Sequence, residues 1–222
     1  MRPGPRRSIK QSDIVAAAFE ILEQSGFAAV SIRGVAAALN LTPTAMYTYF
    51  PSKQELLSAM VEELFAGVLT EPGTGERRRA EPRAAAGSGD ADASTENLLA
   101  AAIELRDRLR AHPGAVSLVT VSGVAGVGTI ALIERLGQGF AAVGLPADDA
   151  ARAAHAFLAH TIGQVALEQA WGEASDDVTE TTLWNDEPTR PIADAGERLG
   201  LRAGDDEEFR ISAGRLLAAW LR

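Results

Sequence analysis

Residues 31–57, which read SIRGVAAALNLTPTAMYTYFPSKQELL, decide the fold of this chain. Ser31 can cap a helix, because its hydroxyl can accept a hydrogen bond from a backbone N–H group of the first turn. The apolar residues that follow recur at i, i+3, i+4 and i+7, which is one face of a helix: they are Ile32, Val35, Ala36 and Leu39. The pattern predicts a short helix that begins directly after Ser31.

A second short helix is predicted over residues 42–49. Asn40 stands where the chain must turn, and asparagine tolerates the left-handed conformation that ends many helices. Thr42 can cap the next helix, with Pro43 at its first position, where a missing N–H costs nothing. Met46 and Phe50 lie one turn apart and are predicted to face inward. The exposed positions then carry hydroxyls and aromatic rings, which suit phosphate oxygens and base edges: Thr44, Ala45, Tyr47, Thr48 and Tyr49.

A third helix is predicted from residue 52 to residue 70. Ser52 and Glu55 have the spacing of a capping box, which marks a helix start. Apolar residues then follow at helical spacing: Leu56, Leu57, Met60, Val61, Leu64 and Phe65. This amphipathic helix would hold the two short helices in place and connect them to the rest of the chain.

These residues resemble the DNA-binding domain of the TetR (tetracycline repressor) family of bacterial transcriptional regulators. The family pattern runs S-x-R-x-V-A-x-x-L, a turn, then L-Y-x-H/Y-F-x-x-K-x-x-L-L, and Met46 is the single conservative departure from it. The matching residues are Ser31, Arg33, Val35, Ala36, Leu39, Tyr47, Tyr49, Phe50, Lys53, Leu56 and Leu57. The preceding Ile14, Ala17, Ala18, Leu22 and Gly26 are similar to the family's first helix, so the resemblance covers residues 10–65.

The resemblance implies an all-α protein with a helix-turn-helix head over residues 10–51 and a C-terminal helical bundle that binds a ligand and dimerises. It implies a transcriptional regulator, most often a repressor, that binds an inverted repeat in double-stranded DNA as a homodimer and responds to a small molecule. The helix over 42–49 would lie in the major groove, with Thr44 and Thr48 near base edges. The DNA-binding residues that it implies are Arg33, Thr42, Thr44, Ala45, Tyr47, Thr48, Tyr49 and Lys53.

Composition excludes several classes of site. The chain of 222 residues has no cysteine and three histidines, so neither a disulfide framework nor a Cys-containing zinc site is available, and no metal or cofactor is expected. Its apolar stretches are broken before about 18 residues, so no membrane span is expected. The basic N-terminus is not followed by the apolar segment of a signal peptide. A cytoplasmic location is therefore expected.

Charge is divided unevenly along the chain. The formal net charge is −9, yet residues 1–60 carry six basic and four acidic residues, whereas the remainder carries 15 and 26. DNA affinity depends on local neutralisation of phosphates, so a mildly basic head on an acidic body can still bind DNA. Residues 1–9 form a basic arm, which is either a solvated tail or reaches DNA through Arg6, Arg7 and the adjoining Lys10.

The C-terminal part is predicted to be a helical bundle. Residues 71–97 contain no apolar residue larger than alanine and are predicted to form a flexible linker, with Arg77, Arg78, Arg79 and Arg83 most often solvated. Over residues 98–222, helices are predicted from Leu98 to His112, Ala115 to about Gly123, Gly128 to Gly144, Pro146 to Trp171 and Glu207 to Arg222. The His-Pro-Gly break and the Gly163-Gln164-Val165-Ala166-Leu167-Glu168 stretch are similar to tetracycline-repressor-type regulatory domains.

This bundle is expected to hold a ligand pocket and a dimer interface. The candidate pocket residues are mostly apolar with a few polar groups, which favours a largely apolar effector: Leu105, Leu109, Val119, Phe140, Phe157, His160, Thr161 and Gln164. For His160, Thr161 and Gln164, the alternative is that their polar groups are satisfied within the core. No Lys or Arg is predicted to face inward, which argues against a strongly anionic effector. The candidate dimer contacts on the last helix are Leu216, Leu217 and Trp220.

No catalytic constellation is present in the sequence. His155 and His160 are five residues apart, about 140° around a helix, so they do not share a face. The glycine-rich segment 122–128 lacks a preceding strand and a lysine, and Asp205 to Glu208 lacks the spaced oxygen ligands of a calcium loop. An enzyme is therefore not expected. The remaining alternative is a helical sensor that has lost DNA binding, which the exposed Thr44, Tyr47, Tyr49 and Lys53 argue against.

Overall fold

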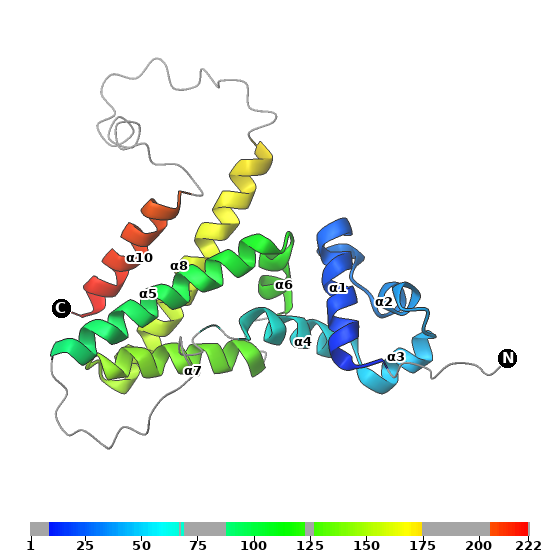
Figure 1. Cartoon of the computed structure of the whole chain (residues 1–222), viewed down its shortest axis with the longest axis horizontal. Coiled ribbons are helices and arrows are strands. Elements are labelled where there is room, and N and C mark those ends of the chain that lie inside the picture. The colour runs from blue at the N-terminus through cyan, green and yellow to red at the C-terminus, as the bar shows by residue number, and fades with distance from the viewer. Residues whose placement is uncertain (1–8, 67, 69–87, 123–126, 175–204, 222) are drawn as a thin grey trace, which may run out of the picture. The chain divides into compact units, whose positions relative to one another are not determined.

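The computed structural model of the chain describes residues 9–66, 68, 88–122, 127–174 and 205–221, and all regular structure within these ranges is helical (Figure 1). The chain divides into two compact units. The first unit contains residues 1–76 and 107–135, and the second contains residues 77–106 and 136–222. The all-α prediction is confirmed, and the unit boundaries fall inside two of the helices.

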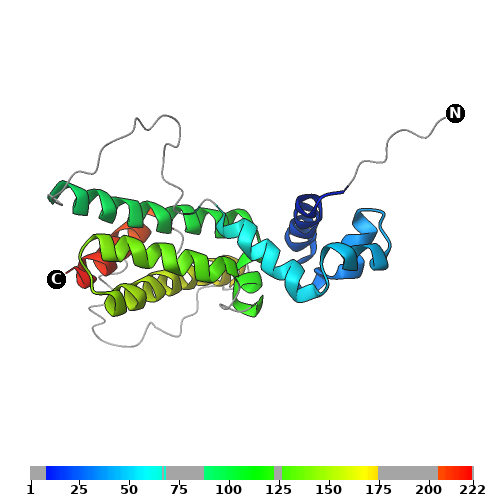
Figure 2. The same ribbon diagram turned by 90° about the horizontal axis from the view of Figure 1, so that it is seen from below.

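The head of the first unit consists of α1 (Gln11–Ser25), a 3₁₀ turn η1 (Phe27–Ala29), α2 (Ile32–Ala38) and α3 (Pro43–Tyr49). α1 contacts both η1 and α2, and α2 contacts α3 (Figure 2). Most apolar residues of the family pattern form the core of this head: Ile14, Ala18, Leu22, Val35, Ala36, Met46 and Phe50 are buried, together with Val30, whereas Leu39 is half-buried.

The first unit also contains α4 (Lys53–Phe65), the last turn of α5 (Ser88–Ala111), α6 (Ala115–Ser122) and the first part of α7 (Val127–Ala142). α4 packs against α1 and α6. Its predicted apolar face is buried, and that face includes Leu56, Leu57, Met60, Val61, Leu64 and Phe65. α4 is therefore the element that ties the head to residues 107–135.

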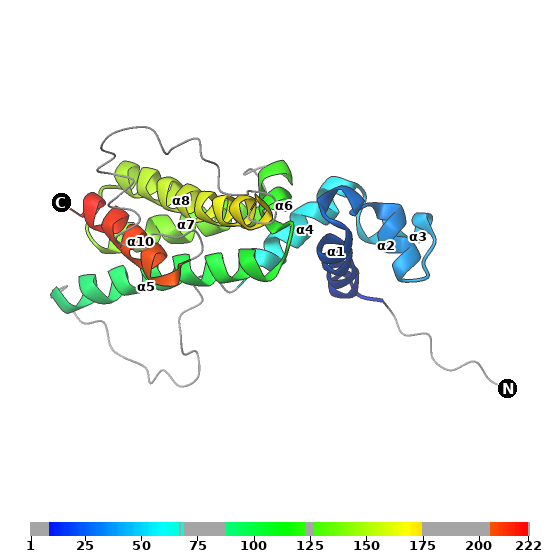
Figure 3. The same cartoon turned by 90° about the horizontal axis from the view of Figure 1, so that it is seen from above.

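The second unit is built from most of α5, the second part of α7, α8 (Ala147–Ala174) and α10 (Asp206–Trp220). α8 and α10 pack side by side (Figure 3). Phe140 of α7 and Phe157 of α8 meet edge to face at 5.9 Å between ring centroids, in the core of this unit. Gly139 allows α7 to approach α5, because a Cβ there would lie 2.8 Å from the Leu98 side chain.

α5 begins ten residues earlier than the sequence predicted. The linker was expected to run to residue 97, but the helix begins at Ser88. Its first turns carry alanine and polar residues, so they lack the apolar period from which a helix is recognised in sequence. Residues 71–87, which include the four arginines, lie outside the described residues. No helix in the described ranges is long and apolar enough to cross a membrane.

Candidate DNA interface

The helix-turn-helix has the local geometry that its sequence predicts. Ser31 Oγ accepts a hydrogen bond from the Gly34 N–H at 3.0 Å and caps α2. Asn40 has φ 55°, and it is the only non-glycine residue with positive φ among the described residues. Thr42 Oγ1 accepts from the Ala45 N–H at 3.2 Å, with Pro43 in the first turn of α3. Both caps and the left-handed turn are confirmed.

α3 presents polar groups on one exposed face. Thr44, Tyr47 and Thr48 are exposed, and because positions i, i+3 and i+4 share a helix face, their side chains lie on one side of α3. Tyr47 is 54% exposed, which is a large exposure for an aromatic residue on a packed helix. Ala45 and Tyr49 are half-buried. Arg33 of α2, Thr42 and Lys53 are exposed, so most of the predicted DNA-binding residues are accessible.

The end of α3 is held by a residue that the sequence reasoning missed. Gln11 Nε2 donates a hydrogen bond to the Tyr49 carbonyl oxygen at 2.9 Å, across 38 residues of sequence. The last carbonyls of a helix lack intrahelical partners, so this bond satisfies one of them and joins α3 to α1. Nearby, the Lys10 N–H donates to the Asp13 carboxylate at 2.8 Å and fixes the start of α1. Arg6 and Arg7 lie outside the described residues.

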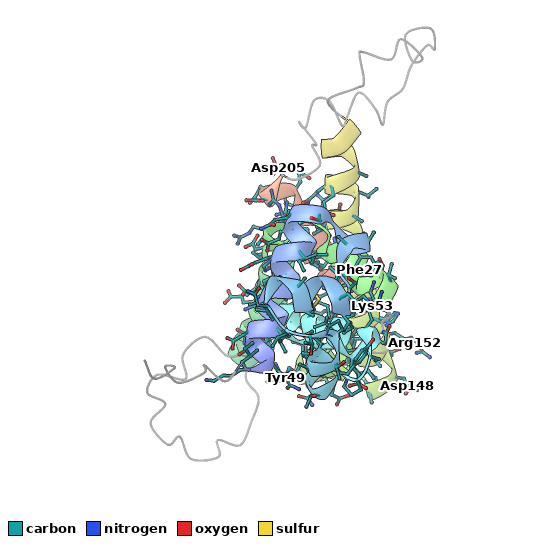
Figure 4. The ribbon with its side chains drawn as sticks, turned by 90° about the vertical axis from the view of Figure 1, so that its right-hand side faces the viewer. Phe27, Tyr49, Lys53, Asp148, Arg152 and Asp205 are labelled. Atoms are coloured by element: carbon teal, nitrogen blue, oxygen red, sulfur yellow. The ribbon has the colours of Figure 1, made fainter. Side chains whose placement is uncertain are left out.

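Lys53 begins α4, beside the head. Ser52 Oγ accepts from the Glu55 N–H at 3.1 Å and caps the helix as predicted. The Lys53 ammonium lies 5.5 Å from the centroid of the Phe27 ring (Figure 4). Within the part of the chain that the structure describes, no carboxylate forms an ion pair with Lys53. Its charge is thus available to a phosphate.

α1 is also joined to the turn between α5 and α6. His112 Nδ1 lies 2.6 Å from Glu23 Oε1, and the His112 ring packs 4.8 Å from the Phe19 ring. Gly114 has φ 86°, and a Cβ there would lie 2.9 Å from the Leu22 side chain. The His-Pro-Gly break seen in the sequence therefore serves as a close contact for the head as well as a helix stop.

The candidate pocket residues are divided between the two units: Leu109 and Val119 belong to the first, and the others belong to the second. All the apolar members are buried. Thr161 Oγ1 donates to the Phe157 carbonyl oxygen at 3.0 Å. His160 Nε2 lies 3.2 Å from Ser212 Oγ, which itself donates to the Phe209 carbonyl oxygen. His160 and Thr161 therefore have partners within the chain, and Gln164 is half-buried.

The second unit contains a buried arginine, which corrects the prediction that no Lys or Arg faces inward. Arg106 of α5 is 1% exposed and lies 4.7 Å from the Phe209 ring centroid. Its guanidinium forms ion pairs with Glu168 of α8 at 2.9 Å and with Asp206 of α10 at 2.7 Å. Burial alone would lower the pKa of Arg106, but the hydrogen bonds to Asp206 and Glu168 outweigh it and raise the pKa.

The candidate dimer residues on α10 differ in burial. Leu217 is 1% exposed in the single chain, so it packs inside its own subunit and is not available to a partner. Leu216 and Trp220 are half-buried. Sequence periodicity alone did not show that Leu217 is more deeply buried than these two residues. On α8, Leu167 is 48% exposed, although the sequence reasoning did not select it.

Comparison with known proteins gives the family. The profile described as "Bacterial regulatory proteins, tetR family" matches residues 14–60, and "Tetracyclin repressor-like, C-terminal domain" matches residues 87–209. The chain is 26% identical over 175 residues to an HTH-type transcriptional regulator of Saccharopolyspora erythraea, a match that covers 79% of this chain and 67% of that protein.

Solved structures give the same result. BioQ of Mycobacterium smegmatis is 26% identical with a TM-score of 0.65, and the match covers 96% of this chain and 98% of that one. BioQ with its natural double-stranded DNA operator is 28% identical, with a TM-score of 0.57 and coverage of 73% and 89%. SCO7222, a TetR from Streptomyces coelicolor, is 25% identical, with a TM-score of 0.70 and coverage of 96% and 98%. The chain belongs to the tetR family of bacterial regulatory proteins and is a DNA-binding transcriptional regulator, not an enzyme.

Proposed function

We propose that this regulator is a cytoplasmic repressor that binds an inverted-repeat operator as a homodimer and leaves it when a small, mostly apolar ligand binds. The observation that carries the DNA part is the exposed face of α3, on which Thr44, Tyr47 and Thr48 lie together while Met46 anchors the opposite face. Thr44 and Thr48 would reach base edges, and Tyr47, Tyr49 and Lys53 would contact phosphates. The similarity to BioQ, which was solved with its operator, supports this proposal.

Exposed faces on α8 and α10 support the homodimer. From residue 156 to residue 170, the outward side of α8 carries small or apolar residues that recur at helical spacing: Ala156, Ala159, Gly163, Ala166, Leu167 and Ala170. On α10 the outward residues of the same kind are Ile211, Gly214 and Ala218, and Leu221 directly follows the helix. A Cβ at Gly163 or Gly214 would meet nothing within 4 Å, so each helix leaves room for a closely packed neighbour. Two such helices from each subunit would form an isologous four-helix interface.

Buried apolar side chains with few polar groups support the ligand part. Phe140 and Phe157 are fully buried, and half-buried Gln164 supplies a polar group on the same helix as Phe157. Arg106 is already engaged by two carboxylates, so it does not favour an anionic effector. Recognition helices must match major grooves about 34–36 Å apart, so a ligand that changes this spacing would release the operator.

The first experiment selects DNA from a pool of random duplexes with the full-length protein. The selected sequences should converge on an inverted repeat, and binding should weaken steeply as salt is raised, because phosphate contacts release counterions. Deletion of residues 1–8 should reduce affinity at low salt if the arm reaches DNA. Failure to enrich any sequence with folded protein would instead favour a helical sensor without DNA binding.

The second experiment screens apolar compounds by thermal shift and then by release of the selected DNA. A compound that stabilises the induced state by about 2.7 kcal/mol would shift the equilibrium about a hundredfold, which is enough to vacate an operator. Phe157→Ala and Gln164→Ala should weaken the response. Compounds that stabilise the protein but never change its DNA affinity would contradict ligand release, and unchanged responses in both variants would contradict the pocket assignment.

A further inference from the structure

Phe27 occupies a position that the backbone fixes. It follows Gly26, which has φ 77° and ψ 171°, a conformation that is essentially restricted to glycine. Phe27 then begins the η1 turn and is half-buried, and η1 packs against α1 and α6. The backbone conformation at Gly26 and the packing of η1 therefore fix the position of Phe27.

The charged end of Lys53 lies over this ring. The distance from Nζ to the ring centroid is 5.5 Å, within the range of about 6 Å at which the negative face of an aromatic ring attracts a cation. Lys53 is the first residue of α4, which Ser52 caps. Local structure thus fixes both the backbone of Lys53 and the Phe27 ring beneath its ammonium group.

We propose that Phe27 is a positioning residue for DNA binding: it holds the Lys53 ammonium over its ring in the free protein, oriented for a backbone phosphate. This inference rests on the proposed function, in which Lys53 contacts that phosphate. Phe27 itself touches no DNA in this proposal. It acts through Lys53 alone.

The physical reason is the cost of ordering a lysine. A free lysine side chain loses rotamer entropy when it is fixed, and a side chain ordered beforehand loses less of it on binding. An ammonium group has three N–H donors, and the ring face occupies only one side of it. The remaining donors stay directed away from the ring, where a phosphate oxygen can accept a hydrogen bond. The apolar ring also displaces water from one side of the charge, which strengthens the attraction to phosphate.

A double-mutant cycle tests the proposal in the full-length protein bound to the duplex selected above. Phe27→Leu keeps an apolar side chain but removes the aromatic face, and Phe27→Tyr keeps the face. Lys53→Met removes the charge and keeps the stem. A contact of this kind corresponds to about two- to fivefold in affinity for each half-site, hence about four- to twenty-fivefold for a dimer on an inverted repeat. Phe27→Leu should show this loss, and Phe27→Tyr should bind as the wild type does.

The decisive comparison is made in the Lys53→Met background. There Phe27→Leu should cause no further loss, because the partner of the ring is already absent. Replacement of Phe27 by trifluorophenylalanine, which keeps the shape of the ring and weakens its negative face, should reproduce the loss seen with Phe27→Leu. This analogue keeps the test valid even if Phe27→Leu also unfolds at a lower urea concentration.

Two results would overturn the inference, and they differ in what else they overturn. If Phe27→Leu weakens binding equally with and without Lys53, Phe27 acts only through the fold, while the phosphate contact of Lys53 stands. If Lys53→Met binds the selected duplex with wild-type affinity and salt dependence, Lys53 makes no phosphate contact. Phe27 then has no role in DNA binding through Lys53.

Discussion

Gln54 of α4 donates a hydrogen bond from Nε2 to the Ser122 carbonyl oxygen at 2.8 Å, which joins the start of α4 to the last residue of α6. Two further contacts hold α4 along its length. A Cβ on Gly128 would lie 2.9 Å from the Glu62 Cα, so α7 approaches the backbone of α4 there. Arg108 of α5 donates hydrogen bonds to carbonyl oxygens at the end of α4, those of Leu64 and Ala66. Within the first unit, α4 is therefore held at its start, middle and end.

Loss of the Gln54 contact should destabilise the first unit. Gln54→Ala is expected to lower the free energy of unfolding by about 0.5–1.5 kcal/mol, the usual net contribution of one such hydrogen bond. Urea unfolding measures this change. Gln24→Ala is the matched control, because Gln24 is exposed on α1. Equal urea midpoints for the two variants would show that the Gln54 bond contributes nothing to stability.

Thr44 and Lys53 should affect DNA binding in different ways. Thr44→Ala should change base preference with little change in affinity for random DNA, because the hydroxyl would lie near base edges. Lys53→Ala should weaken all sequences alike and lower the salt slope by about one unit for each subunit. Binding titrations at several salt concentrations measure both, with the exposed Arg135→Ala as a control for lost charge. If Thr44→Ala lowers the affinity for operator and random DNA equally, Thr44 does not contribute to base recognition.

Leu167 and Leu217 should separate dimerisation from folding. Leu167→Glu places a charge on the exposed face of α8 and should give folded monomers in sedimentation experiments, whereas Ala151→Glu on the same helix should remain dimeric. Leu217→Ala should instead lower the free energy of unfolding by about 2–5 kcal/mol, because it leaves a cavity in the subunit core. A folded dimer from Leu167→Glu would place the dimer contact elsewhere.

The half-buried His160 should make stability depend on pH. Burial lowers the pKa of His160, whose ring stacks on Phe209 at 6.0 Å, and the Arg106 guanidinium lies over the same Phe209 ring. The unfolded chain, with a histidine pKa of about 6.5, then binds the proton more strongly than the folded chain. The contribution of neutral His160 to stability is complete above that pH and is lost as the pH falls below it.

Unfolding by urea at about pH 7.5 and about pH 5.5 tests this dependence, since the two values bracket the unfolded pKa. His160→Gln should reduce the difference between the two free energies of unfolding. His155→Gln, an exposed change on the same helix, should keep the wild-type difference. If His160→Gln keeps it as well, another group accounts for the pH dependence.

The sequence predicted the head well because its determinants are local. Ser31, Thr42 and Ser52 each cap the helix that directly follows, and Asn40 adopts the left-handed turn, all within 22 residues of sequence. Caps and turns depend on bonds between near neighbours, so residue type and spacing suffice to identify them. Apolar periodicity then identified the buried face of each helix.

The second unit was harder to predict because its determinants are distant in sequence. Arg106 flanks an apolar stripe on α5, and its partners lie 62 and 100 residues away. A charged residue beside such a stripe is most often solvated, and periodicity gives no sign of the carboxylates that other helices bring to it. An acidic Glu168 in an otherwise apolar stretch of α8 was the available signal. Both the Phe27–Lys53 and the Gln11–Tyr49 contacts escaped prediction for the same reason.

The burial of one side of α10 has an evolutionary consequence. The inner row, with Phe209, Ala213 and Leu217, is constrained by packing within one chain, so most substitutions there would reduce the amount of folded protein. The outward row carries no such constraint from its own subunit. After gene duplication, two copies of this regulator could diverge on the outward row until each pairs only with itself, while both continue to fold. If the proposed homodimer forms through this face, the same helix would allow paralogous regulators in one cell to become insulated from each other without losing stability.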